Sequence, residues 1–92
     1  RDIFKLYAYF WATGTREQAV GFCQRFNSNL VVAKAQVRDT PDADGQWPVM
    51  IDHDRLVFEE ERLEPRTIVK MVRRFQFIVR NGITRFDVDK IF

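Results

Sequence analysis

This chain has little of the residues on which compact catalytic and metal motifs depend. Its 92 residues include one cysteine, one histidine and four glycines. The sequence has no CxxC pair, no glycine-rich phosphate loop and no Ser/His/Asp set. We therefore expect a protein that works by binding rather than by catalysis, with no cofactor and no bound metal. An enzymatic role is uncertain and less expected.

The lone cysteine, Cys23, has no second cysteine with which to form an internal disulfide. A single cysteine favours a reducing compartment, and we therefore expect a cytoplasmic protein. Near the N-terminus the longest apolar run, residues 6–12, is too short to span a bilayer, so a membrane is not among the expected partners. A length of 92 residues and a hydrophobic content of 46% predict one domain over residues 1–92, and the strands and helices that its patterns predict make it α+β.

Charge is unevenly distributed along the chain. Residues 1–38 hold six basic and two acidic residues (+4), residues 39–64 hold two and nine (−7), and residues 65–92 hold seven and two (+5). These blocks could pair with each other across the folded surface, or one of them could face a partner.

The first half of the sequence predicts a strand, a helix and a second strand. Residues 3–12 alternate, with apolar side chains at even positions. Thr15 and Gln18 have the spacing of a capping box, so a helix should start near Arg16. Its apolar stripe consists of Ala19, Phe22, Cys23 and Phe26. Residues 30–37 read as a strand whose inward side chains are Val31, Ala33, Ala35 and Val37.

The second half predicts an exposed acidic loop over residues 39–46 and then further strands and a helix. Residues 47–51 and 55–60 read as a hairpin joined by a turn at 52–54, and one long bent strand is the alternative. Pro65 suits the first position of a helix that runs to Arg80, with Asn81-Gly82 as its stop. The last stretch, residues 83–92, is expected to be a strand.

This order of elements favours an antiparallel sheet with both helices packed on one face. The simplest arrangement that obeys the right-handed crossover rule is the ferredoxin-like (split βαβ) fold.

Two groups of residues are candidates for binding. Tyr7, Tyr9 and Trp11 should project from the first strand on the side away from the helices, where they predict self-association, most simply as a dimer. Stacking of nucleic-acid bases on these rings and cover by the chain's own loop through Trp47 are the alternatives.

The second group lies on the second helix, where helical spacing gathers cations and one aromatic on a single face. A phosphate backbone or an acidic protein would select such a face. A solvated face paired with acidic residues 59–61 is the alternative. The group consists of Arg66, Lys70, Arg73, Arg74, Phe77 and Arg80.

Other polar residues carry weaker signals. His53 should lie in the turn with Asp52 and Asp54, a set too small for a metal site. Acidic residues of the 39–46 loop do not match a calcium-binding loop. Cys23 should be a core residue with a raised pKa.

These patterns lead to three hypotheses. The first is a non-enzymatic interaction or regulatory module that self-associates and binds a protein partner. The second is a nucleic-acid-binding domain that uses the basic second helix. The third is an enzyme of the dimeric α+β barrel kind that works without a cofactor.

Overall fold

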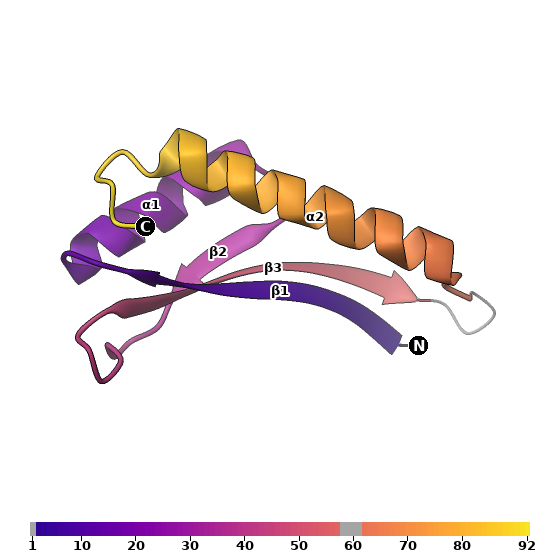
Figure 1. Ribbon diagram of the computed structural model, residues 1–92, viewed down its shortest axis with the longest axis horizontal. Coiled ribbons are helices and arrows are strands. Elements are labelled where there is room, and N and C mark those ends of the chain that lie inside the picture. Colours follow the sequence, from indigo (N-terminus) through magenta and orange to yellow (C-terminus); the bar gives the residue numbers. More distant parts are fainter. Residues whose placement is uncertain (1, 58–61) are drawn as a thin grey trace.

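The computed structural model describes residues 2–57 and 62–92, which form a small α+β structure (Figure 1). A three-stranded antiparallel sheet makes one layer, and both helices lie on the same side of it. The predicted α+β class is confirmed. Along the chain, the elements are β1 (Asp2–Ala12), α1 (Arg16–Asn29), β2 (Lys34–Val37), β3 (Trp47–Val57) and α2 (Pro65–Phe86).

The strand order is β1-β3-β2, which makes β1 an edge strand. All eleven residues of β1 pair with β3, from Asp2↔Val57 to Ala12↔Trp47. The predicted alternation in β1 is confirmed, because Ala12 is buried on the helix side while Ile3, Tyr7 and Trp11 are exposed. The long pairing with β3 therefore presents one side of β1 to the helices and the other to solvent.

The start of α1 forms as predicted. Oγ1 of Thr15 accepts a hydrogen bond from the backbone N–H of Gln18 at 3.2 Å, and Oε1 of Gln18 accepts one from the N–H of Thr15 at 3.0 Å. This capping box satisfies two N–H groups that would otherwise lack partners at the helix N-terminus. The apolar stripe of α1 is buried as expected and consists of Ala19, Phe22, Cys23 and Phe26.

β2 is shorter than the predicted strand over residues 30–37. It spans Lys34–Val37, and Val31, expected to point inward, is 94% exposed. The side chain of Asn27 on α1 donates to the carbonyl of Ala35 at 2.9 Å and accepts from its N–H at 2.7 Å. An α1 side chain therefore occupies backbone groups of β2 that another strand would need.

β3 is one continuous strand, so the hairpin prediction is wrong and its alternative, a single long strand, is correct for residues 47–57. The expected turn at 52–54 does not form, because Asp52 and Asp54 stay in register with β1 and both lie 3.7 Å from Nζ of Lys5. Residues 58–60 of the predicted hairpin lie outside the described residues.

α2 begins at Pro65 as predicted but continues to Phe86, six residues beyond its expected last residue, Arg80. The predicted strand over residues 83–92 is therefore wrong. After the helix ends, the carboxylate of Asp87 accepts hydrogen bonds from the N–H groups of Ile91 at 2.9 Å and Phe92 at 3.0 Å. These bonds fold the C-terminal residues into a compact turn. Because the described residues supply three strands, the ferredoxin-like arrangement is not confirmed.

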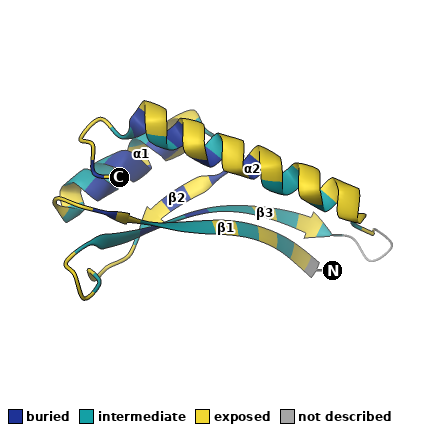
Figure 2. Cartoon of the chain, in the orientation of Figure 1, coloured by how far each residue is buried: buried dark blue, intermediate teal, exposed yellow. Residues whose placement is uncertain are grey.

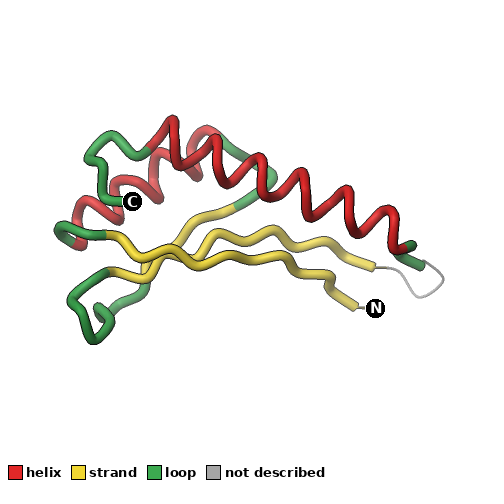
Figure 3. The backbone as a smooth tube through the Cα atoms, viewed as in Figure 1, coloured by secondary structure: helices red, strands yellow, loops and turns green. Residues whose placement is uncertain are grey.

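The hydrophobic core lies towards one end of a molecule whose principal extents are 45 × 25 × 20 Å. Figure 3 shows α2 running along the long axis, between the end of the molecule where α1 lies and the opposite end. None of the buried core residues falls within residues 3–8 of β1, 52–57 of β3 or 65–74 of α2, a region we call the distal end. Figure 2 accordingly shows these segments in the colours of intermediate and exposed residues.

Candidate binding surfaces

The outer face of α2 gathers the predicted cations. The helix has six basic residues and no acidic residue among its 22 positions. Because helical rise is about 1.5 Å per residue, Arg66 and Arg80 mark the ends of a stripe about 21 Å long. All of its members are exposed, and we call the set the cationic face: Arg66, Lys70, Arg73, Phe77 and Arg80.

No cation of α2 forms an ion pair with a residue that the structure describes. The ion pairs within residues 2–57 and 62–92 use Lys5, Arg16 and Arg25 instead. The predicted alternative partners, residues 59–61, lie outside the described residues. Like charges at i and i+4 destabilise a helix by about 0.2–0.5 kcal/mol per pair, and Lys70 has such neighbours in Arg66 and Arg74. The cationic face therefore carries unfavourable charge that these contacts leave uncompensated.

Phe77 projects from the middle of the cationic face and is 68% exposed. It lies between two surface depressions. One is lined by Lys70, Arg73 and Arg74, and the other by apolar and polar residues at the junction of the two helices. The second depression is lined by Leu30, Phe77, Ile78, Asn81, Gly82, Arg85 and Phe86. An exposed ring beside an apolar depression and several cations is a favourable anchor for a partner.

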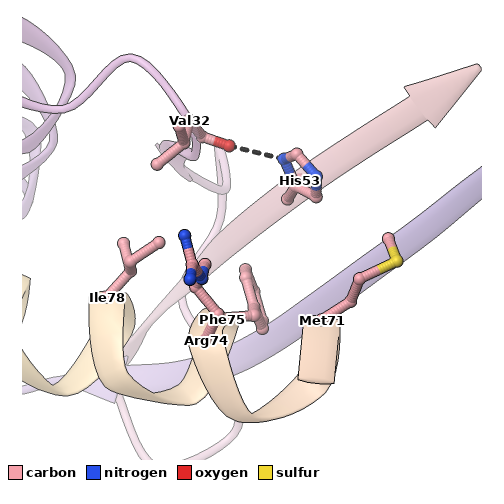
Figure 4. Close-up of a pocket in the computed structure, with 6 residues that line it drawn as sticks. All are labelled: Val32, His53, Met71, Arg74, Phe75 and Ile78. Carbon is pink, nitrogen blue, oxygen red and sulfur yellow. Dashed lines mark hydrogen bonds between the residues drawn. The ribbon is translucent and has the colours of Figure 1, made fainter. Parts of the chain in front are cut away.

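Arg74 departs from the other predicted residues because it also lines a cavity on the inner side of α2. The cavity has a volume of about 120 Å³. Figure 4 draws its lining residues, which come from α2, from β3 and from the segment at Val32. Its apolar walls are Val32, Met71, Phe75 and Ile78, with His53 and Arg74 completing the lining.

His53 lies within β3 and not in the predicted turn. Its Nδ1 is 2.6 Å from the carbonyl oxygen of Val32, as drawn in Figure 4. Because a carbonyl only accepts, Nδ1 carries the proton in this contact and donates it. The only histidine thereby ties β3 to the segment before β2.

The predicted aromatic face of β1 does form on the side of the sheet away from the helices. Tyr7 and Tyr9 make an edge-to-face contact with ring centroids 6.0 Å apart. Arg38 donates a hydrogen bond to the Tyr9 hydroxyl at 2.8 Å, with its guanidinium 5.6 Å from the centre of that ring. Trp47 does not cover these rings, because it pairs with Ala12 and so faces the helices, under Arg16. Cover through Trp47 is therefore wrong, whereas Arg38, which directly precedes the 39–46 loop, packs against Tyr9.

The acidic loop over residues 39–46 uses its carboxylates locally. Oδ1 of Asp42 accepts hydrogen bonds from the N–H groups of Asp44 and Gln46, and Asp39 lies 3.4 Å from Arg16. Across the part of the chain that the structure describes, no three His, Cys, Asp or Glu side chains are grouped so that they could hold a metal ion. Asp42 therefore stabilises a turn within the loop, and Asp39 pairs with a residue of α1.

Cys23 is 6% exposed on the buried side of α1. Burial raises the pKa of its thiol from 9.0 to about 11, although the nearby Arg16 acts in the opposite direction. The core role and the raised pKa predicted for this residue are both confirmed.

The structure thus brings the cations together with Phe77 and keeps Tyr7, Tyr9 and Trp11 on the opposite side of the sheet. Sequence reasoning missed Arg85, which lines the depression beside Phe77, and Arg38, which holds Tyr9. Arg85 follows Phe77 by eight residues, a spacing that brings two residues of one helix to nearby faces. A helix prediction that ran beyond Arg80 would have identified Arg85.

Comparisons with protein-family models, curated protein sequences and solved structures find no match to this chain. Neither helix within residues 2–57 and 62–92 has the length and apolar content needed to cross a membrane.

Proposed function

We propose that the chain is a non-enzymatic interaction module that associates with a second copy of itself and binds an acidic protein partner through the cationic face of α2. One observation carries the choice of partner. A 22-residue helix has six basic residues and no acidic one, and none of its cations forms an ion pair with a described residue.

An acidic partner would lower the free energy of this surface by placing carboxylates among like charges. Arginine forms paired hydrogen bonds with carboxylates, and five of the six cations on α2 are arginines. Phe77 and the depression beside it would hold an apolar side chain of the same partner. A short acidic segment with one large apolar residue combines both requirements.

Nucleic acid is the second candidate, because exposed cations beside an aromatic ring also suit phosphates and a stacked base. The depression between Phe77 and the junction of the two helices favours the protein partner instead. Leu30, Ile78 and Phe86 line it, and a phosphate backbone makes no use of such apolar contacts.

We also propose that this module works in the cytoplasm. Its one cysteine is buried as a free thiol, which suits a reducing compartment.

Fluorescence anisotropy with a labelled peptide tests the proposed partner. The peptide is rich in Glu and Asp and carries one Leu, and duplex DNA and single-stranded RNA are titrated in parallel. We expect binding of the peptide that weakens with salt, and a loss of about tenfold or more in affinity for Phe77→Ala and for Arg73→Glu. The matched controls are Leu56→Ala and Lys34→Glu, an exposed apolar residue and an exposed cation away from α2, which should leave the affinity unchanged.

Two results would contradict the protein-partner proposal. Tighter binding of DNA or RNA, lost on the same two α2 substitutions, would establish the nucleic-acid candidate in its place. Absence of binding to all three probes at low salt would overturn both candidates.

A further inference from the structure

The two edges of the sheet differ in how they are protected. Proteins usually block edge strands by making them short, by charge, by proline or by cover from another element, because free backbone groups recruit other strands. β2 has such protection, since it spans four residues and Asn27 occupies both backbone groups of Ala35. β1 is eleven residues long, contains no proline and pairs only with β3 among the described residues.

Lys5 is the one cation within β1, and its charge offers little protection to the edge. Its Nζ lies 3.7 Å from carboxylate oxygens of both Asp52 and Asp54 on β3. These contacts draw the ammonium group towards the neighbouring strand and offset its charge. The outer edge of β1 is thus long and uninterrupted, and from Ile3 to Ala12 its one charged side chain is paired with β3.

The distal end supplies a second, independent observation. On the helix side of β1, Phe4 and Leu6 are only partly buried, and so are Ile68 and Met71 on α2, although all four are apolar. No described residue in this region reaches the burial of the core around Phe22 and Phe26. A further element beside β1 would cover these side chains.

We infer that two copies of the chain pair antiparallel through the outer edges of β1, with Tyr7 opposite Tyr7 of the partner copy. This inference specifies the self-association proposed above and rests on it. A two-fold pairing that uses every residue of Asp2–Ala12 must be centred on position 7, the midpoint of the strand. The product is one continuous sheet of six strands.

This register opposes no like charges. It places Lys5 opposite Tyr9 and Ile3 opposite Trp11 of the other copy, with Tyr7 opposite itself on the two-fold axis. Aromatic and apolar pairs directly across two strands are favourable. On the helix side, Phe4 would lie opposite Phe10, which adds apolar contact at the distal end.

Edge pairing suits this chain better than stacking of two sheets through the aromatic face. That face also carries Lys5, Lys34, Asp52 and Asp54 between the rings, as the register and the ion pairs show. Stacking would remove these charges from water, which is unfavourable without new partners. Edge pairing leaves them solvated.

Disulfide trapping tests the register. Facing residues of antiparallel strands have Cα atoms about 4.5–5.5 Å apart, within the range of about 4.4–6.8 Å that a disulfide bridges. In a Cys23→Ala background, Tyr7→Cys should form a covalent dimer on mild oxidation. Tyr9→Cys alone should not, because its copies would lie about 13 Å apart along the strands. A mixture of Lys5→Cys and Tyr9→Cys chains should cross-link.

Light scattering over a range of concentrations separates the possible failures. We expect a dimer that Tyr7→Lys converts to a monomer and that Phe77→Ala leaves intact. A monomer at every concentration would overturn the self-association itself. A dimer that survives Tyr7→Lys, or that cross-links through Tyr9→Cys alone, would overturn the β1 register while leaving self-association standing.

Discussion

The ring of Phe26 on α1 fills the space that a side chain at position 82 of α2 would need. A Cβ at position 82 would lie 2.8 Å from Cδ2 of Phe26, and closer still to Cε2. Phe26 is fully buried and packs between the rings of Phe22 and Phe86. Gly82 therefore serves the close approach of two helices and does not end α2.

Replacement of Gly82 by alanine should destabilise the protein even though alanine favours a helix by about 1 kcal/mol over glycine. Overpacking of a filled core costs about 1–3 kcal/mol, and the ring of Phe26 is buried between those of Phe22 and Phe86. The difference of these two effects should lower the free energy of unfolding of Gly82→Ala by up to about 2 kcal/mol, as measured by urea denaturation.

Gly21→Ala on α1 is the matched control. A Cβ there would meet only the end of the Arg25 side chain, at 3.2 Å. Its free energy of unfolding should be unchanged or raised by up to about 1 kcal/mol. If both substitutions stabilise the protein equally, the close approach of α1 and α2 at Gly82 is wrong.

Asp87→Ala should release the C-terminal residues. The carboxylate of Asp87 accepts the N–H groups of Ile91 and Phe92, which holds Ile91 in the core and Phe92 against Phe22, with ring centroids 4.8 Å apart. Hydrogen bonds to a charged group contribute about 1.5–3 kcal/mol. Amide hydrogen exchange at residues 91 and 92 should become markedly faster in the variant.

Asp89→Ala provides the comparison for that experiment. Asp89 forms a part-exposed ion pair with Arg25 at 3.7 Å, and pairs of that kind contribute about 0–1 kcal/mol. Exchange at residues 91 and 92 should change little. Equal acceleration by both substitutions would show that Asp87 does not hold this segment.

Cys23 should make the protein less stable at high pH. Its thiol has a pKa of about 11 in the folded chain, against 9.0 without burial. Above pH 9 the unfolded chain loses this proton first, so the free energy of unfolding falls from about pH 9 to about pH 11. The full effect is at most about 2–3 kcal/mol, since each pKa unit corresponds to about 1.4 kcal/mol.

The pH dependence is isolated by subtraction. The same titration of Cys23→Ala removes the contributions of lysine and tyrosine, which both proteins share. The free energy of unfolding of the unsubstituted chain minus that of Cys23→Ala should be constant below pH 9 and should decrease above it. A constant difference from pH 7 to 11 would mean that the thiol titrates normally in the folded chain.

Local patterns predicted the parts of this fold that depend on neighbouring residues. The capping box of α1, the alternation in β1 and the grouping of cations on α2 each follow from spacing within one element. The cationic face depends only on helical periodicity, so its residues lie on one side of α2 as the spacing predicted.

Parts that depend on distant contacts were predicted wrongly. Glycine after asparagine is typical of a helix end, so Asn81-Gly82 predicted one. Gly82 instead makes room for the ring of Phe26, which lies 56 positions earlier in the sequence. Asp52 and Asp54 are residue types that favour turns. Their pairing with Lys5 on the neighbouring strand could not be read from the local sequence. The free edge of β1 follows from the same cause, because the residues expected to form a further strand extend α2 instead.

The most direct test of the proposed cationic face is a paired measurement on Lys70→Glu. In the free protein this substitution replaces repulsion from Arg66, Arg73 and Arg74 by attraction, so the free energy of unfolding should rise by about 0.5–1 kcal/mol. Affinity for the acidic peptide should fall by about tenfold or more. A rise in stability with a loss of binding is the result that the account predicts. A fall in stability, or an affinity equal to that of the unsubstituted chain, would contradict it.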